Sequence, residues 1–283
     1  MCGIFGIIGA DVLAVPDPVG AALLSLHHRG PDQGARHDAT LGAHRVVVAA
    51  RRLALVDPAG GRQPFVRASG AVLAFNGEIY NHAALRRDLE ERGETFRTKS
   101  DTEVLCALLE RDGLAGLARV EGSFALAFLG SERGPLWLAR DRAGVRPLAW
   151  ARTPRGVAFA STVDALAACG LVPRTADPIA IADVLRDGVV HDTRSALTGV
   201  RRVRPGSAIR ITPDLAVVEV DLPVAPPTAA PGSADAEEGV LDALRAAVAD
   251  RLALERPAGV FLSGGVDSAL VAALARDHGR FPA

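Results

Sequence analysis

The chain has few cysteines and few aromatic residues. Three cysteines in a chain of this length exclude a small disulfide-stapled scaffold. Its 283 residues include three cysteines, Cys2, Cys106 and Cys169, which cannot all pair and which form neither a CxxC motif nor a Cys/His cluster. A reducing cytoplasm is therefore the expected compartment. Aromatic residues make up 4% of the chain, so we expect a core built from Val, Leu, Ile and Ala.

An excess of one charge and a long hydrophobic run are also missing. The 32 basic and 33 acidic residues leave a net charge of -1 without a block of like charge, which argues against nucleic acid as a partner. The N-terminal segment MCGIFGIIGADVLAVPDP has no basic n-region, and Asp and Pro interrupt it too early for a signal peptide or a membrane span. We therefore expect mature sequence with no membrane association.

Strand-like and helical patterns alternate in blocks along the chain. The residues from Cys2 to about Ile8 form a short apolar run that predicts a buried strand. Helical periodicity appears in HAALRRDLEERG, ending at Gly93, and in DTEVLCALLERDG, ending at Gly113. Strands in blocks with helices between them predict an α+β or layered αββα domain. Further strand-like runs are AHRVVVA, RLALVD, AVLAFNG, SFALAFLG, PLWLARD, PLAWAR and GVAFAST.

A Pro- and Ala-rich segment, LPVAPPTAAPGSA, separates two parts of different pattern and is the best linker candidate. We expect a first domain over 2–215, a linker over 216–234 and a second domain over 235–283. The second part contains an amphipathic helix (DAEEGVLDALRAAVADRLAL), a short buried strand (AGVFL) and another helix (VDSALVAALARDHG). These elements cannot enclose a doubly wound sheet, so we expect this domain to be incomplete.

Cys2 follows the initiator methionine, which is usually removed when the next residue is small. The thiol and the α-amino group then belong to one residue. The amine has an unperturbed pKa of roughly 7.7 to 8.0, so at neutral pH it can act as general base for the thiol. One residue can thus supply both nucleophile and base. For an isolated cysteine, an ordinary buried side chain is the better interpretation.

Four motifs change that balance. CGIFGIIG, HRGPD, NGEIYN and SDTEV occur in this order and resemble the class II glutamine amidotransferases of the N-terminal-nucleophile superfamily. NGEIYN, HRGPDQG and RLALVDPAGGRQP together are most similar to the asparagine synthetases among them. The resemblance covers nearly all of residues 2 to 212. It implies a four-layer αββα fold and hydrolysis of glutamine to glutamate and ammonia through a γ-glutamyl thioester on Cys2.

The resemblance also assigns the residues that bind glutamine. Attack on the side-chain amide creates an oxyanion, which needs preorganised donors. The resemblance gives this role to the Asn76 amide and the Gly77 backbone N–H. The α-carboxylate of glutamine is assigned to Arg52, and its α-ammonium to Asp101 with help from Glu78. No cofactor is implied for this reaction.

Several neighbouring residues are interpreted as structural. Arg29 and Asp32 of HRGPD are expected to hold the active-site loop by internal pairing rather than to take part in catalysis. DRAGVRP resembles the DRFGIKP segment of the same family and is interpreted as scaffold. The residues given structural or surface roles are His28, Arg51, Asp141, Arg142 and Arg146.

The motif SGGVDS, from Ser263 to Ser268, follows an apolar segment and opens a helix. Glycines and serines in this setting can form a nest of backbone N–H groups for pyrophosphate. The motif resembles the PP-loop of ATP pyrophosphatases that adenylate a carboxylate, which implies ATP and Mg²⁺ as cofactors of a synthetase domain. Asp267 is the implied Mg²⁺ ligand. The implied pyrophosphate-binding residues are Ser263, Gly264, Gly265, Asp267 and Ser268.

Three functions remain in contention. The first is the N-terminal part of a glutamine-hydrolysing asparagine synthetase, whose ammonia is meant for an ATP-activated aspartate. The second keeps the glutaminase but gives it another carboxylate as acceptor. The third is a non-catalytic, truncated remnant. We expect no asparagine synthesis by this chain alone, because the second metal ligand and the aspartate pocket would lie beyond Ala283. The oligomeric state is open, a homodimer included.

Overall fold

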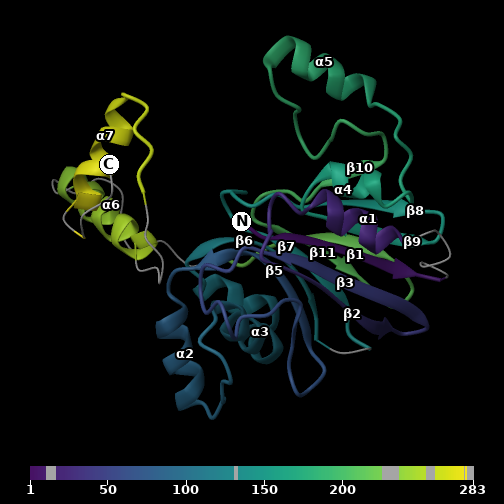
Figure 1. Ribbon diagram of the computed structural model, residues 1–283, viewed down its shortest axis with the longest axis horizontal. Coiled ribbons are helices and arrows are strands. Elements are labelled where there is room, and N and C mark those ends of the chain that lie inside the picture. Colours follow the sequence, from purple (N-terminus) through teal and green to yellow (C-terminus); the bar gives the residue numbers. More distant parts are fainter. Residues whose placement is uncertain (11–16, 131–132, 225–235, 253–258, 277, 279–283) are drawn as a thin grey trace. The chain divides into compact units, whose positions relative to one another are not determined.

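In the computed structural model (Figure 1) the chain divides into two compact units. The first holds Met1–Ala54 and Pro58–Pro223, and the second holds Leu55–Asp57 and Val224–Ala283. Within the described part of the chain, no helix is long and apolar enough to cross a membrane. The structure describes residues 1–10, 17–130, 133–224, 236–252, 259–276 and 278.

The first unit contains two six-stranded sheets whose neighbouring strands are all antiparallel. The first sheet has the order β10-β8-β9-β1-β3-β2, and the second has the order β12-β11-β7-β6-β5-β4. The strands of the first sheet are β1 (Gly3–Gly9), β2 (Gln33–Leu41), β3 (His44–Arg52), β8 (Ala149–Thr153), β9 (Gly156–Ala160) and β10 (Val200–Arg202). Those of the second are β4 (Phe65–Val66), β5 (Val72–Ile79), β6 (Gly122–Leu129), β7 (Leu136–Arg140), β11 (Ser207–Ile211) and β12 (Val217–Asp221).

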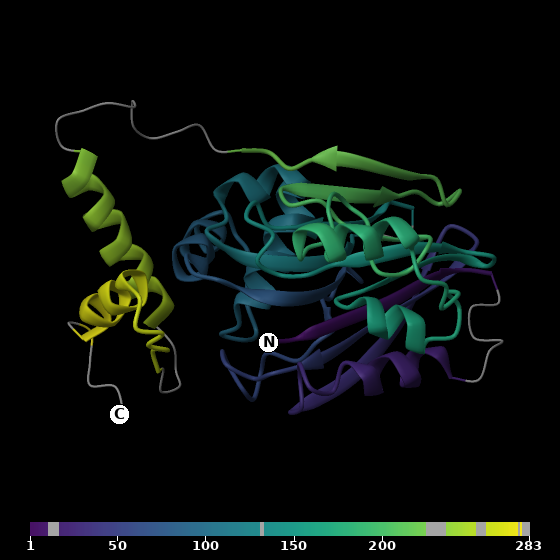
Figure 2. The same cartoon turned by 90° about the horizontal axis from the view of Figure 1, so that it is seen from above.

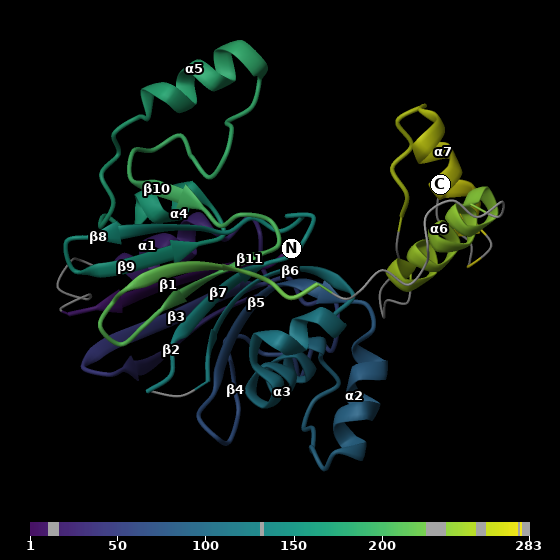
Figure 3. The same cartoon turned by 180° about the vertical axis from the view of Figure 1, so that it is seen from behind.

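The two sheets pack face to face, and helices cover their outer faces (Figures 2 and 3). Alternate residues of β1 belong to different cores: Ile4 and Ile8 lie between the sheets, whereas Phe5 and Ile7 contact the helices. This arrangement is the predicted αββα fold. The helices over the first sheet are α1 (Pro18–Ser25) and α4 (Val163–Ala168), and those over the second are α2 (His82–Glu91) and α3 (Asp101–Asp112).

Two further helical segments complete the first unit. The 3-10 helix η1 (Gly113–Arg119) continues directly from α3. Helix α5 (Pro178–Asp187) begins at its N-cap Asp177, whose carboxylate accepts from the backbone N–H of Ile179 and Ala180, and it extends away from the sheets in Figure 1.

The helices of the second unit are α6 (Ala236–Leu252) and α7 (Val266–Arg276). A short segment without regular secondary structure precedes α7. Val248, Leu274 and Ala275 form its small buried cluster. The predicted buried strand AGVFL is wrong for its described residues, 259–262, which form no strand, and Phe261 is 99% exposed. A strand requires a neighbouring strand for its backbone hydrogen bonds, and none pairs with this segment among the described residues.

The other strands and helices predicted from the sequence are confirmed except RLALVD, whereas β2, β4, β10, β11, β12, α1, α4 and α5 were not predicted. RLALVD leaves the sheet after Arg52 and continues as loop, because the Ala54 N–H is taken by the Asp32 carboxylate at 2.8 Å rather than by a strand. The edge strand β2 was missed because its pattern is half-exposed and polar. The linker expected from residue 216 begins later, since Val217–Asp221 pairs with β11 as strand β12. Most of that linker, 225–234, lies outside the described residues.

Candidate active site

Cys2 lies immediately before β1 at the edge of the space between the sheets. Its side chain is 9% exposed, and its place in the alternation of Ile4 and Ile8 turns it toward the inter-sheet core. The Sγ atom lies 3.9 Å from the Leu53 carbonyl oxygen, and the Cys2 carbonyl accepts from Arg29 Nε at 3.1 Å. The predicted nucleophile is thus held at both its side chain and its main chain.

Burial disfavours the charged form of both groups at this terminus. Burial raises the pKa of the Cys2 thiol, while the Leu53 contact, the terminal amine and Arg52 oppose the rise. Burial likewise lowers the pKa of the Met1 amine; the Cys2 thiolate opposes this, whereas Arg146 and Arg29 add to it. While Met1 is attached, the amine is one residue away from the thiol it would have to deprotonate. Removal of Met1 places both groups on Cys2.

Asn76 is the most unusual polar residue of the site. It is 0% exposed, and alternation along β5 places its side chain on the same face as Val72 and Ala74, which line the space between the sheets. Neither its Oδ1 nor its Nδ2 has a hydrogen-bond partner among the described residues. A buried unpaired polar group costs about 1–3 kcal/mol, so this amide is suited to a ligand that would complete it.

Gly77 follows Asn76 where β5 and β6 approach closely. A Cβ atom at this position would lie 2.1 Å from the Ser123 carbonyl oxygen and 2.8 Å from the Phe124 Cα. Both neighbours are backbone atoms that cannot move without shifting β6. Glycine is therefore required for this strand pairing as well as for access to the backbone.

One edge of β5 is open beside these residues. Strand β4 pairs only with Val72 and Leu73, and beyond it side chains replace the missing strand. The Phe75 N–H donates to Gln63 Oε1 at 2.8 Å, and the Ile79 N–H donates to Asp101 Oδ2 at 3.2 Å. Backbone N–H groups of an antiparallel strand alternate between its two edges, so the Gly77 N–H points to this same edge, between the other two.

The remaining predicted glutamine-binding residues come from three elements. Arg52, the last residue of β3, is 5% exposed and donates from a guanidinium nitrogen to the Pro58 carbonyl at 3.1 Å. Asp101 is 6% exposed at the start of α3, and burial raises its carboxyl pKa, opposed first by the Ile79 N–H. Glu78 is half-buried on β5. Both charges act on the Cys2 thiol: Arg52 lowers its pKa, and Asp101 raises it.

The neighbouring motif residues differ from expectation in two respects. Arg29 and Asp32 do not pair with each other in the described part of the chain: Arg29 binds the Cys2 carbonyl and Asp32 binds the Ala54 N–H. Arg51 is no solvated surface residue, because it lies on the outer face of β3 and contacts the His27 ring.

The residues of DRAGVRP lie around a fully satisfied carboxylate. Asp141 is 2% exposed and accepts from the backbone N–H groups of Phe124, Val145 and Arg146 at 3.0–3.1 Å. The side chain of Arg146 in turn donates to Ser123 Oγ at 3.1 Å. This network fixes the turn after β7 against β6, as the interpretation of Asp141 as scaffold requires.

In the second unit, the glycine-rich loop opens α7 as predicted. Asp267 lies in the first turn, Gly264 has a φ of 84°, and the hydroxyls of Ser263 and Ser268 lie 3.0 Å apart. Ser268 Oγ also donates to the Gly265 carbonyl at 3.0 Å. No group of three or more His, Cys, Asp or Glu side chains that could hold a metal ion occurs among the described residues.

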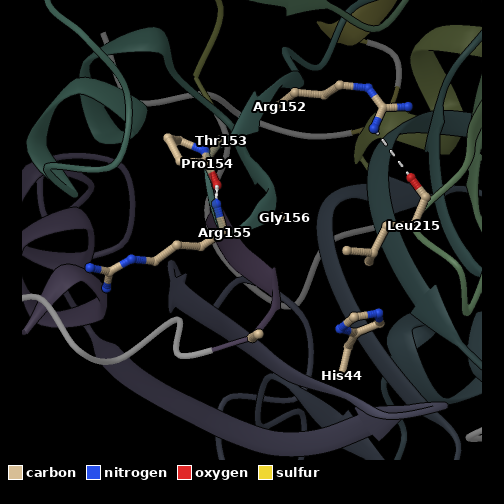
Figure 4. Close-up of a pocket in the computed structure, with 8 residues that line it drawn as sticks. His44, Arg152, Thr153, Pro154, Arg155, Gly156 and Leu215 are labelled. Carbon is tan, nitrogen blue, oxygen red and sulfur yellow. Dashed lines mark hydrogen bonds between the residues drawn. The ribbon is translucent and has the colours of Figure 1, made fainter.

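A cavity of about 600 Å³ lies at the end of β1 remote from Cys2 (Figure 4). His44, Arg152 and Arg155 are among its lining residues. In Figure 4 the guanidinium groups of Arg152 and Arg155 extend in different directions, and Arg152 donates to the Leu215 carbonyl at 3.3 Å. These cations do not converge on a common point as an anion site requires.

Comparison with known proteins places this geometry in a family. Residues 1–219 match the glutamine amidotransferase domain family, and residues 239–282 match the asparagine synthase family. The chain belongs to the glutamine amidotransferase domain family. The resemblance inferred from CGIFGIIG, HRGPD, NGEIYN and SDTEV is confirmed at the level of the family.

Relatives of this amidotransferase domain include named asparagine synthetases. Asparagine synthetase [glutamine-hydrolyzing] 3 of Bacillus subtilis (strain 168) is 29% identical over 284 residues, which cover 98% of this chain and 46% of that protein. A putative asparagine synthetase [glutamine-hydrolyzing] of Mycobacterium bovis is 33% identical over 302 residues, with the same two coverages. The chain thus spans less than half the length of these relatives.

Solved structures support the fold. The glutamine phosphoribosylpyrophosphate amidotransferase of B. subtilis matches with a TM-score of 0.56 and 20% identity, over 98% of this chain and 64% of that one. A structure described as the allosteric regulatory enzyme of purine biosynthesis matches with a TM-score of 0.57 and 22% identity, over 99% and 64%. At these identities the likeness concerns the fold alone.

Proposed function

We propose that this amidotransferase domain hydrolyses glutamine to glutamate and ammonia, with Cys2 as the nucleophile after removal of Met1. The unpaired, fully buried amide of Asn76 is the observation that supports this most directly. Asn76 is followed by Gly77, whose N–H points to the open edge of β5, and together the two residues would offer two donors to an oxyanion. No structural bond would have to break when the substrate binds Asn76.

The reaction follows from these groups. The freed α-amine takes the proton of the Cys2 thiol, and the sulfur attacks the side-chain carbonyl carbon of glutamine. The C–N bond then breaks, the leaving nitrogen takes the proton as ammonia, and a thioester remains on Cys2. The same amine deprotonates a water molecule, which attacks the thioester. The protonated amine then returns the proton to the sulfur as glutamate leaves. Asn76 and Gly77 stabilise the oxyanion in both steps.

Substrate selection rests on the two opposite charges at the site. Arg52 pairs with the α-carboxylate of glutamine, and Asp101 with Glu78 pairs with its α-ammonium. The buried Asp101 carboxylate gains a cationic partner on binding, which offsets the desolvation that raises its pKa. A free amino acid with a side-chain amide therefore fits better than a peptide.

The test is glutaminase activity of the Cys2→Ala protein, with Cys169→Ala as control. Cys169 is 2% exposed and packs among residues of the first sheet and its helices, so its loss changes stability but leaves the site intact. We expect no ammonia release from Cys2→Ala and near-normal kcat from Cys169→Ala. Full activity of Cys2→Ala, or an active preparation whose intact mass still includes Met1, would refute the proposal.

We further propose that the ammonia serves an ATP-dependent amidation, with aspartate as the acceptor suggested by the names of the relatives and another carboxylate as the alternative. The loop at Ser263–Ser268 would hold the pyrophosphate of ATP, and Asp267 would contact Mg²⁺ at the phosphates. The match of residues 239–282 to the asparagine synthase family supports this. Loss of Mg²⁺-ATP binding in Asp267→Asn, measured by calorimetry, tests the loop separately from the glutaminase.

The expected compartment is the cytoplasm, on the ground that all three cysteines are free thiols. A homodimer is the proposed oligomeric state. Glutamine, ATP and aspartate are the proposed small-molecule partners.

A further inference from the structure

Gln63 is a buried side chain that connects the two halves of the proposed glutamine site. It is 4% exposed and lies just before β4, at the point where the edge of β5 opens. Its Oε1 accepts from the Phe75 N–H at 2.8 Å, and its Nε2 lies 3.5 Å from Thr102 Oγ1 as donor. One amide thus reaches both β5 and α3.

Each contact adjoins a residue with a role in the proposed reaction. Phe75 precedes Asn76, so the Gln63 acceptor fixes the main chain from which the unpaired amide projects. Thr102 follows Asp101 in the first turn of α3, and its hydroxyl also donates to Asp101 Oδ1 at 3.4 Å. Gln63 therefore contacts the neighbour of the proposed oxyanion donor Asn76 and the neighbour of the proposed ammonium ligand Asp101. It is not itself one of the proposed glutamine-binding residues.

The open edge gives this bridge its importance. Strand β4 stops pairing at Leu73, and among the described residues the side chains of Gln63 and Asp101 accept from the N–H groups of Phe75 and Ile79 at that edge. A neighbouring strand would fix β5 continuously, but it would also bury the Gly77 N–H. Two isolated side-chain acceptors, Gln63 and Asp101, leave that donor accessible while satisfying the N–H groups on either side of it.

We propose that Gln63 is a positioning residue that sets the spacing between the oxyanion donors on β5 and the ammonium-binding carboxylate on α3. The inference rests on the proposed glutaminase function. Glutamine bound by its α-ammonium at Asp101 must present its side-chain amide to Asn76. The distance between α3 and β5 therefore has to match the length of the substrate. A shift of about 1 Å in this distance can cost on the order of 100-fold in rate.

The test compares Gln63→Leu, which keeps the volume and removes both hydrogen bonds, with Thr102→Val, which removes the α3 partner of Gln63 together with the Thr102–Asp101 hydrogen bond. Ser207→Ala is the matched control: Ser207 is 0% exposed on β11 of the same sheet, and among the described residues its hydroxyl bonds only the Arg204 carbonyl, at 2.8 Å. Kinetics with glutamine give kcat and KM for each, and hydrogen exchange reports the amides of 73–79 and 98–105 without reference to activity.

We expect Gln63→Leu to lower kcat and raise KM together, with at least a tenfold loss in kcat/KM, and to speed exchange in both segments. Thr102→Val should raise KM chiefly, because it also removes the hydrogen bond to Asp101, and the loss in kcat of the double variant should equal that of Gln63→Leu, in which the bridge is already broken. Ser207→Ala should lose stability with kcat and KM unchanged. A folded Gln63→Leu protein with kcat and KM within twofold of the parent overturns the positioning role.

The exchange measurement separates this inference from the proposed function. If the parent releases no ammonia from glutamine, the proposed function fails, and the bridge is still judged by exchange. Faster exchange confined to 73–79 in Gln63→Leu would show that Gln63 holds only its own sheet, which also overturns the proposal.

Discussion

The backbone N–H of Ile79 donates a hydrogen bond of 3.2 Å to Oδ2 of Asp101. This contact ties the strand that carries Asn76 and Gly77 to the first residue of α3. It makes the proposed ammonium ligand also an acceptor for the open edge of β5. The carboxylate therefore has a structural role beside its proposed role in binding, and substitution can separate the two.

Asp101→Asn should stabilise the free protein at neutral pH and weaken glutamine binding. Burial raises the folded-state pKa of Asp101, so holding this group in the folded state costs free energy at any pH where it is ionised in the unfolded chain. Asparagine keeps an acceptor for Ile79 without that cost. The gain in melting temperature should disappear as pH falls below about 4, the ordinary Asp pKa, because both states are then protonated. A melting series over pH with KM at neutral pH checks this, and an unchanged KM would contradict it.

Substitution of Asn76 should raise the stability of the protein and lower its catalytic rate. Asn76→Leu removes an unpaired buried amide and should raise the free energy of unfolding by about 1 kcal/mol, while kcat falls by about 10²- to 10³-fold. Asp141→Leu is the contrasting control, since Asp141 accepts three backbone hydrogen bonds and its loss should destabilise by about 3 kcal/mol. Denaturant unfolding and steady-state kinetics measure both. Destabilisation by Asn76→Leu would mean that the amide has a structural partner.

Gly77→Ala should destabilise the fold by about 1–3 kcal/mol, because the added methyl meets the Ser123 carbonyl oxygen at 2.1 Å. Gly34→Ala is the matched control on β2: its Cβ would lie 2.5 Å from the end of the Arg51 side chain, which can move. We expect little change in melting temperature for Gly34→Ala. Equal effects of the two substitutions would show that the β5–β6 approach is not the cause.

An electrophilic chloroketone analogue of glutamine should modify Cys2 and spare the other two thiols. Burial raises the pKa of all three thiols, that of Cys106 to about 12, but after removal of Met1 Cys2 alone among them carries a free amine on the same residue and lies at the proposed glutamine site. Peptide mapping by mass spectrometry after labelling gives the site. Protein that retains Met1 should label slowly, because its amine is not on Cys2; equal labelling rates for processed and unprocessed protein would contradict this.

The linear sequence determined the class of fold and pointed to the residues proposed for the site. Apolar runs such as SFALAFLG and the glycine-terminated helix ending at Gly113 depend on local periodicity and capping, which a single chain displays directly. Resemblance of the motifs to a known family assigned Cys2, Arg52, Asn76, Gly77 and Asp101 to the proposed site, in roles that a reaction on glutamine requires. Strand β2 was not, since an exposed edge strand lacks the apolar signal on which such patterns depend.

Only the tertiary structure decided how these groups are held. The side chain of Gln63 reaches Phe75 and Thr102 because β4 ends early and α3 packs on β5, and neither event leaves a local trace in the sequence. The same holds for the unpaired amide of Asn76, whose isolation depends on what two separate sheets place around it. Residue identity is fixed locally, whereas hydrogen-bond satisfaction and burial are properties of the whole packed arrangement.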